Sequence, residues 1–312
     1  MILAAALCTT LASVPSGSAR AQDLDRRIPV RPAGLLQVDL DLGEEVRPDR
    51  VSLEVRSHDA DEVWIVAELS GLGDSSVKFR VEHDEQTVRL YARSGGLMSW
   101  LFGGPGVTVN IWVPREFSLD LRSSSGPIRI EDVRGEIRAR TTEAVIEVRA
   151  VEGRLKLRTD SGSVEVVEML GAVEVKSTAG SVELAWVTGD VEVRTGEGDI
   201  LIRHVAGRSQ LRTGTGEIEI REARGATLAK TERGAIYASF AGAPEGRLET
   251  RRGSVVVAFP SHMGAALDAR TRHGVVEVDQ KPGGSEYIGA VNGGGEALVI
   301  YSARGSIRVG RR

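Results

Sequence analysis

The sequence predicts an all-β protein, a parallel two-sheet β-solenoid with 18-residue coils that is preceded by an N-terminal β region. Three observations lead to this prediction: a glycine repeat, an alternation of apolar and polar residues, and a low aromatic content. Aromatic residues make up 4% of the 312 residues, whereas 37 residues are glycine. A chain of this kind, rich in valine and isoleucine as well, is typical of many short strands joined by tight turns.

Glycine recurs every 18 residues between positions 123 and 240. The first series, with alanine at one place, is Gly126, Ala144, Gly162, Gly180, Gly198, Gly216 and Gly234. A second series lies halfway between and comprises Gly135, Gly153, Gly171, Gly189, Gly207 and Gly225. Apolar residues follow each glycine at alternate positions, as Val164 and Val166 follow Gly162. Each half of the repeat therefore predicts one strand with one inward face and one turn.

Stacking of such coils predicts two parallel sheets with neighbouring strands ~4.8 Å apart and a dry core of valine and isoleucine. Two other solenoids are excluded. A hexapeptide β-helix needs an apolar residue at every sixth position, but Lys176 lies six residues after Leu170. A calcium-binding nonapeptide roll needs aspartate two residues after the last glycine of its motif, where this chain has an inward isoleucine or valine.

The chain divides by composition into four parts. These are a signal peptide at 1–21, a flexible lead-in at 22–34, an N-terminal β region at 35–106 continuous with the solenoid, and a repeat domain at 107–312. Regular coils are expected at 123–240 and irregular ones at 241–312. The apolar start and the sequence Ala19-Arg20-Ala21 predict export to the periplasm, the cell envelope or the medium. Cleavage there removes Cys8, the only cysteine, which excludes disulfides and cysteine metal sites. The segment is too short to span a bilayer.

A glycine-bounded stretch between Ser94 and Gly106 breaks the alternation. It holds five large apolar residues, Leu97, Met98, Trp100, Leu101 and Phe102. Two interpretations stay open. The stretch folds over an open end of the solenoid as a cap, which we favour because open sheet edges are usually covered, or it contacts a partner or a membrane.

Several short motifs carry a resemblance to a known family. They are Thr-x-x-Gly-x-Val-x-Val units such as Thr159 to Val166, the entry Val113 to Arg122, and Asn292 to Gly295 before Ser306 to Val309. In these motifs, over roughly residues 35–312, the chain resembles a bacterial β-strand-repeat family of unknown function whose members carry the label "putative adhesin". The resemblance implies a non-enzymatic solenoid, secreted or associated with the envelope, with no catalytic residues to transfer.

One outward position is basic in seven successive coils. This basic ladder comprises Arg122, Arg140, Arg158, Lys176, Arg194, Arg212 and Lys230. It is either a solvated surface that keeps the protein soluble or a linear array that binds a polyanion such as an anionic glycan, lipid A phosphate or teichoic acid. A column of Ser and Thr next to it, from Ser123 to Thr231, predicts hydroxyls that bond turn backbone. Glutamates at outward positions of the other sheet predict an acidic face: Glu147, Glu165, Glu183 and Glu219.

The alternative function is a polysaccharide lyase or hydrolase, since such enzymes occur on β-helices. Its candidate residues would be Asp160, Glu197, Asp199 and Glu232, which lie on different coils without flanking aromatics. No histidine pair has metal-ligand spacing, so neither a metal nor a cofactor is expected. A net charge of −4 gives no indication of nucleic-acid binding. We therefore expect a non-enzymatic binding or structural protein. Its expected partners are an anionic envelope polymer, another envelope protein, or further copies that associate through the solenoid ends.

Overall fold

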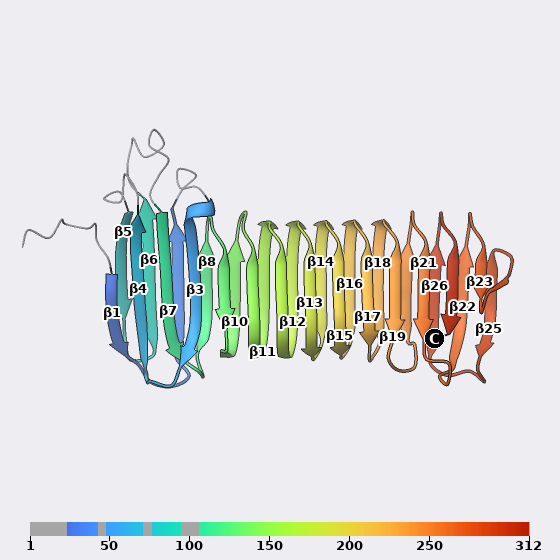
Figure 1. Ribbon diagram of the computed structural model, residues 1–312, viewed down its shortest axis with the longest axis horizontal. Coiled ribbons are helices and arrows are strands. Elements are labelled where there is room, and N and C mark those ends of the chain that lie inside the picture. The colour runs from blue at the N-terminus through green and yellow to red at the C-terminus, as the bar shows by residue number, and fades with distance from the viewer. Residues whose placement is uncertain (1–23, 43–47, 71–76, 95–105, 312) are drawn as a thin grey trace, which may run out of the picture.

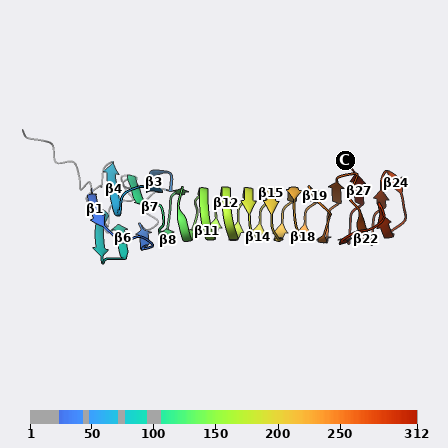
Figure 2. The same ribbon diagram turned by 90° about the horizontal axis from the view of Figure 1, so that it is seen from below.

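The computed structural model describes residues 24–42, 48–70, 77–94 and 106–311, which form an elongated all-β solenoid (Figure 1). The strands stand side by side across the long axis, in two layers that Figure 2 shows from below. The helical structure in this part of the chain is a single 3-10 turn, η1 (Pro48–Arg50). It contains no helix long and apolar enough to cross a membrane. The predicted fold class is confirmed.

Regular coils form the middle of the molecule. Their strands are β9 (Ile128–Glu131), β10 (Arg134–Thr141), β11 (Ile146–Ser161), β12 (Val164–Ala179), β13 (Val182–Thr188), β14 (Val191–Glu197), β15 (Ile200–Ala206), β16 (Ser209–Thr215), β17 (Ile218–Ala223), β18 (Thr227–Arg233) and β19 (Ile236–Phe240). Parallel pairing joins residues 18 apart, as in Val164 with Val182 and Val173 with Val191. We call the layer with β9, β13, β15, β17 and β19 sheet I, and the layer with β10, β14, β16 and β18 sheet II. The long strands β11 and β12 run through both.

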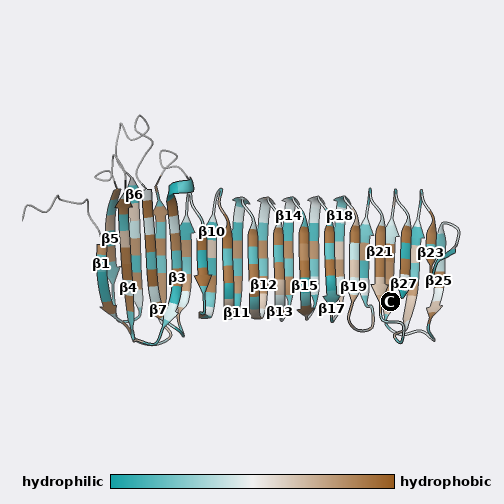
Figure 3. Cartoon of the chain, viewed as in Figure 1, coloured by the Kyte–Doolittle hydropathy of each residue, from teal (hydrophilic) through white to brown (hydrophobic). Residues whose placement is uncertain are grey.

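The inward columns make a continuous apolar core, as the alternation predicts. Val164 and Val166 are 1% and 0% exposed, and their counterparts in the neighbouring coils are buried as well. Fully burying a Val or Ile side chain contributes ~1.5–3 kcal/mol. The alternating bands of apolar and polar residues along the strands are visible in Figure 3.

The turns between the sheets depend on glycine and on buried hydroxyls. Gly171 has φ +130°, and a Cβ there would overlap the carbonyl oxygen of Gly153 in the preceding coil. The hydroxyls of Thr213 and Thr231 donate to the carbonyl oxygens of Gly198 and Gly216, each at 3.0 Å. Five hydroxyls of the Ser/Thr column thus bond turn backbone, as the sequence predicts. Those of Thr141 and Thr159 are buried without a hydrogen-bond partner among the described residues.

The N-terminal coils do not stack in chain order. Their strands are β1 (Leu24–Pro29), β2 (Leu35–Asp41), β3 (Val51–His58), β4 (Glu62–Ser70), β5 (Val77–His83), β6 (Thr87–Ser94), β7 (Gly106–Pro114) and β8 (Ser118–Ser123). The coil of β2 and β3 lies between the coil of β6 and β7 and the coil of β8 and β9. Antiparallel β4 and β1 then extend sheet I, and antiparallel β5 extends sheet II.

The C-terminal coils are interleaved in the same way. Their strands are β20 (Gly246–Thr250), β21 (Val255–Phe259), β22 (Ala265–Thr271), β23 (Val276–Val278), β24 (Lys281–Pro282), β25 (Glu286–Val291), β26 (Ala297–Ser302) and β27 (Ile307–Arg311). The last coil of the chain, β26 and β27, lies between the coil of β20 and β21 and the coil of β22 and β23. Antiparallel β24 and β25 border this end.

The predicted flexible lead-in at 22–34 is wrong for its described part. Leu24–Pro29 forms β1, which pairs with β4, and Ile28 is 4% exposed. The backbone NH groups of Val30 and Arg31 donate to the carbonyls of Asp61 and Glu85. The charged residues Asp25, Arg26 and Arg27 of β1 are exposed, so its composition resembles a linker, while Ile28 joins the core. The predicted signal peptide and the apolar stretch from Leu97 to Phe102 lie outside the described residues.

Candidate polyanion-binding groove

The seven residues of the basic ladder lie in register on the outer surface of sheet II. Each rung is the direct cross-strand partner of the next, from Arg122 on β8 to Lys230 on β18. Six parallel-strand intervals give the ladder a length of about 29 Å at ~4.8 Å per interval. The column continues with an acidic residue at each end of the ladder. Asp39 is the cross-strand partner of Arg122, and Glu249 is the cross-strand partner of Lys230.

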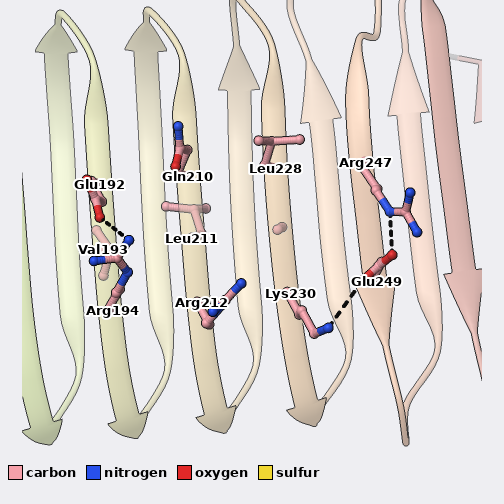
Figure 4. Close-up of a pocket in the computed structure, with 11 residues that line it drawn as sticks. Glu192, Val193, Arg194, Gln210, Leu211, Arg212, Leu228, Lys230, Arg247 and Glu249 are labelled. Atoms are coloured by element: carbon pink, nitrogen blue, oxygen red, sulfur yellow. Dashed lines mark hydrogen bonds and ion pairs between the residues drawn. The ribbon is translucent and has the colours of Figure 1, made fainter.

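Three separate shallow hollows border the ladder, and we refer to them together as the groove. Its first section is lined by the rungs from Arg122 to Lys176. The second section runs from Arg158 to Arg194. The third contains Arg194, Arg212 and Lys230 and ends at Glu249 (Figure 4). Successive sections share rungs, so together they border the ladder along its whole length. The first and third lie on the side of Lys156 and Glu192, and the second lies on the side of Ser177 and Thr195.

Three rungs of the ladder have no acidic partner among the described residues. The paired rungs are Arg122 with Asp120 at 3.5 Å, Arg194 with Glu192 at 2.6 Å, Lys230 with Glu249 at 3.4 Å, and Lys176 with Glu174. The rungs without an ion pair are Arg140, Arg158 and Arg212. Arg140 and Arg158 are neighbours in the first section of the groove. Figure 4 shows Arg212 between two paired rungs.

Three further cations of this groove are absent from the predicted ladder, two in its first section and Arg247 in its third. Arg138 and Lys156 line its first section, one column over from Arg140 and Arg158. Arg138 pairs with Glu136 at 2.7 Å, and Lys156 lies 3.6 Å from the same carboxylate. The alternation of the strands would have been sufficient to predict Arg138 and Lys156, since both precede a ladder residue by two positions and so lie on the same face of the sheet.

The cations of the groove lower the pKa of two of its glutamates, Glu174 and Glu249. The pKa of Glu174 is lowered, chiefly by the hydrogen bond from Lys176, and further by the charges of Lys156 and Arg194, while burial opposes the shift. Glu249 also has a lowered pKa: burial raises it, but Arg247 and Lys230 outweigh that effect. An anionic ligand in the groove would experience the same field.

The predicted acidic character of sheet I is small, because arginines pair with its glutamates: Arg129 from the same column, and Arg149, Arg203 and Arg221 from the neighbouring one. All four glutamates are paired: Glu147 with Arg129 at 3.1 Å, Glu165 with Arg149 at 3.8 Å, Glu183 with Arg203 at 2.6 Å, and Glu219 with Arg221 at 2.7 Å. In its two outward columns from β9 to β19, sheet I carries four cations and five acids. The three outward columns of sheet II from β8 to β18 carry eleven cations and five acids.

The candidate residues for an enzyme do not converge. The carboxylate of Asp199 accepts a hydrogen bond from the backbone NH of Glu217 at 2.7 Å, which fixes a turn. Glu232 lies 3.7 Å from Arg251. Asp160 and Glu197 belong to different coils, two rungs apart. Within the described ranges, no group of three or more His, Cys, Asp or Glu residues could hold a metal ion.

Comparison with protein families matches residues 46–293 to the family described as Toastrack DUF4097. The chain belongs to this family. The family match confirms the resemblance that the sequence motifs carry. A search of curated proteins finds no match to this Toastrack chain.

Solved structures similar to this Toastrack chain come from several bacteria. A "putative lipid binding protein" from Parabacteroides distasonis ATCC 8503 is 11% identical, with a TM-score of 0.43 over 92% of this chain and 96% of that one. A "putative adhesin" from Bacteroides fragilis NCTC 9343 is 12% identical, with a TM-score of 0.32 over 92% and 97%. A "putative cell adhesion protein" from Clostridium sporogenes ATCC 15579 is 10% identical, with a TM-score of 0.20 over 93% and 100%. Similarity at this level carries no argument about function.

Proposed function

We propose that this protein is a non-enzymatic binding protein of the bacterial envelope that holds a linear polyanion along the groove of sheet II. The observation that carries the proposal is the row of seven aligned cations, three of which have no acidic partner among the described residues. The ladder runs along the solenoid axis, so an extended polymer that follows it would lie across the strands and meet one cation per coil.

Electrostatics distinguishes this arrangement from a surface that serves only solubility. Like charges at directly paired positions of neighbouring strands destabilise a sheet. Sheet I has charged columns of the same register, but there each glutamate is neutralised by an arginine. The unpaired rungs of sheet II retain their mutual repulsion, and an anionic polymer would relieve it.

The chemistry of the rungs indicates the class of ligand. Five of the seven are arginines, whose planar guanidinium binds carboxylate or phosphate oxygens in a bidentate manner. Uronic-acid polysaccharides and phosphodiester polymers such as teichoic acid both supply these groups in a chain. Export of the protein to meet such a polymer rests on the apolar segment that ends at Ala21.

Salt-dependent binding tests the proposal. Alginate, as the carboxylate polymer, and lipoteichoic acid, as the phosphate polymer, would be titrated into the protein at rising NaCl concentrations. We expect the affinity to fall linearly with salt on a double logarithmic scale. A variant with Arg140, Arg158 and Arg212 changed to serine should bind more weakly, with the slope reduced by about one for each lost contact.

The matched control carries the same three changes on sheet I, at Arg129, Arg203 and Arg221. It loses the same formal charge and should bind as the unmodified protein does. Equal loss in both variants would reduce the effect to net charge and overturn the groove assignment. Absence of binding to both polymers at low salt would overturn the proposed function.

A further inference from the structure

One corner between the two sheets places a column of residues in the left-handed region of backbone conformation. The column comprises Asp132, Ala150, Glu168, Trp186, His204 and Glu222, with φ between 51° and 59°. Each member precedes the residue that fills the core at that corner, such as Val187 after Trp186. This conformation is unfavourable for bulky residues, and no packing in the core requires tryptophan here, because Trp186 is 57% exposed.

The tryptophan is nevertheless held in a fixed orientation. Its indole stacks on the imidazole of His204, with ring centroids 3.9 Å apart and an angle of 10° between the planes. The Nδ1 atom of His204 lies 3.1 Å from a carboxylate oxygen of Glu222 in the next coil. The column therefore presents a preorganised aromatic platform, supported from one side by two further coils.

A shallow groove opens on the side of Trp186 that faces the preceding coils. Ala150 and Glu168 take the corner positions there, and Leu170, 52% exposed, adds an apolar edge. The ion pair of Arg134 with Glu152, at 3.1 Å, forms another part of the lining. Glu168 has no hydrogen bond or ion pair with any described residue, so its carboxylate is available to a ligand.

We propose that this corner groove binds a neutral sugar ring of an oligosaccharide or polysaccharide. The C–H face of a pyranose is apolar and matches an exposed indole, which offers a large and rigid contact surface. Its hydroxyls would donate to Glu168 and exchange hydrogen bonds with the paired Arg134 and Glu152. Glu168 and Glu152 would repel an acidic sugar, which separates this site from the basic groove. Because the corner groove is shallow and open, it can accept a sugar unit from the interior of a polysaccharide chain.

The test uses neutral oligosaccharides of glucose, N-acetylglucosamine, mannose and galactose, with choline as a cationic probe. Binding to the full chain would be measured by calorimetry and by the quenching of tryptophan fluorescence. We expect saturable binding of at least one oligosaccharide, insensitive to NaCl, and a loss of affinity of at least tenfold in Trp186→Ala. Ala150 occupies the same corner position, so the fold accommodates alanine there. Glu168→Gln should weaken binding severalfold.

Tyr237→Ala is the matched control, because Tyr237 is 40% exposed on the outer surface of sheet I, away from the corner. It should bind as the unmodified protein does. Failure of every oligosaccharide to bind at millimolar concentration, or undiminished binding by Trp186→Ala, would overturn the proposal. Binding of choline through Trp186 in preference to the sugars would overturn it in favour of a cation site. None of these results depends on the basic groove.

Discussion

The two broad faces of the solenoid share one core and one register, yet they differ in how their charged side chains are paired. On sheet I, Arg203 lies 2.6 Å from Glu183, and every other outward glutamate of the regular coils is paired as well. On sheet II, Arg158 has like-charged partners on both sides, Arg140 and Lys176, and no ion pair of its own among the described residues.

This difference indicates what each face is built for. Sheet I shows that the repeat can place opposite charges side by side in the same geometry, which is sufficient for a solvated surface. Sheet II aligns seven cations in one column and leaves three of them, Arg140, Arg158 and Arg212, without an ion pair among the described residues. Alignment of like charges costs stability, so its occurrence on one face only is the structural argument for a ligand there.

The largest loss of stability is expected from a change in the core that the two sheets share. Val164→Asp would put an unpaired carboxylate into the core, where Val164 is 1% exposed, at a cost of more than about 4 kcal/mol. Limited proteolysis and thermal unfolding should show several coils lost. Ser163→Asp, the exposed neighbour, should leave both unchanged. Normal protease resistance of Val164→Asp would contradict the shared core.

A glycine in a turn gives the next largest effect. In Gly171→Ala, the added Cβ would overlap the carbonyl of Gly153 while φ stays at +130°, so we expect a loss of roughly 3 kcal/mol. The control is Gly242→Ala, where no atom lies within 4 Å of the added Cβ. Denaturant midpoints compare the two. Equal midpoints would show that the close approach of successive turns is not required.

The comparison of the faces itself predicts opposite signs for one kind of change. Arg203→Ser removes a paired cation and should destabilise the protein by up to about 1 kcal/mol. Arg158→Ser removes an unpaired cation from between two others and should be neutral or stabilising by a few tenths of a kcal/mol. Melting temperatures at low salt would measure both. If both variants lose the same stability, the ladder is not under repulsion.

The smallest effect is expected for the pH dependence of stability that one corner residue, Asp132, contributes. The pKa of Asp132 is lowered from 3.8, chiefly by the hydrogen bond from Arg115 at 2.6 Å, with Ser57 adding to it and burial opposing it. Because the folded pKa is lowered, this carboxylate contributes stability above pH ~4, and the contribution is lost as the pH falls through the lowered value.

Asp132→Asn isolates this contribution, since asparagine also tolerates the left-handed conformation. The variant should unfold more readily at neutral pH, and its stability should fall less on acidification. Urea titrations at several pH values provide the measurement. Parallel pH profiles for the two proteins would rule out the Arg115 pair as a source of stability.

Local periodicity made most of the fold predictable. The two glycine series define the turns, the residues two and four positions after Gly162 define the inward face, and the coil length follows from both. The basic ladder could be listed for the same reason. Pairing within sheet I could not be anticipated by reading one column at a time, because Glu183 is neutralised by Arg203 from the next column and the next coil.

The ends of the molecule were less predictable because nonlocal pairing decides them. Nothing in β26 and β27 indicates that they insert between the coil of β20 and β21 and the coil of β22 and β23. The strand β1 has the charged composition of a linker, and only its pairing with β4 reveals its place. The stack of Trp186 on His204 joins residues 18 apart that look like unrelated surface positions when the chain is read in order.

The dependence of affinity on ligand length tests the linear groove most directly. Uronic-acid oligomers of increasing length would be titrated into the protein at low salt. The affinity should rise with each added sugar until the oligomer spans the groove, about 29 Å for seven rungs, and then level off. The variant with Arg140, Arg158 and Arg212 changed to serine should lose most of this rise. The same affinity for a disaccharide as for the longest oligomer would contradict a linear site.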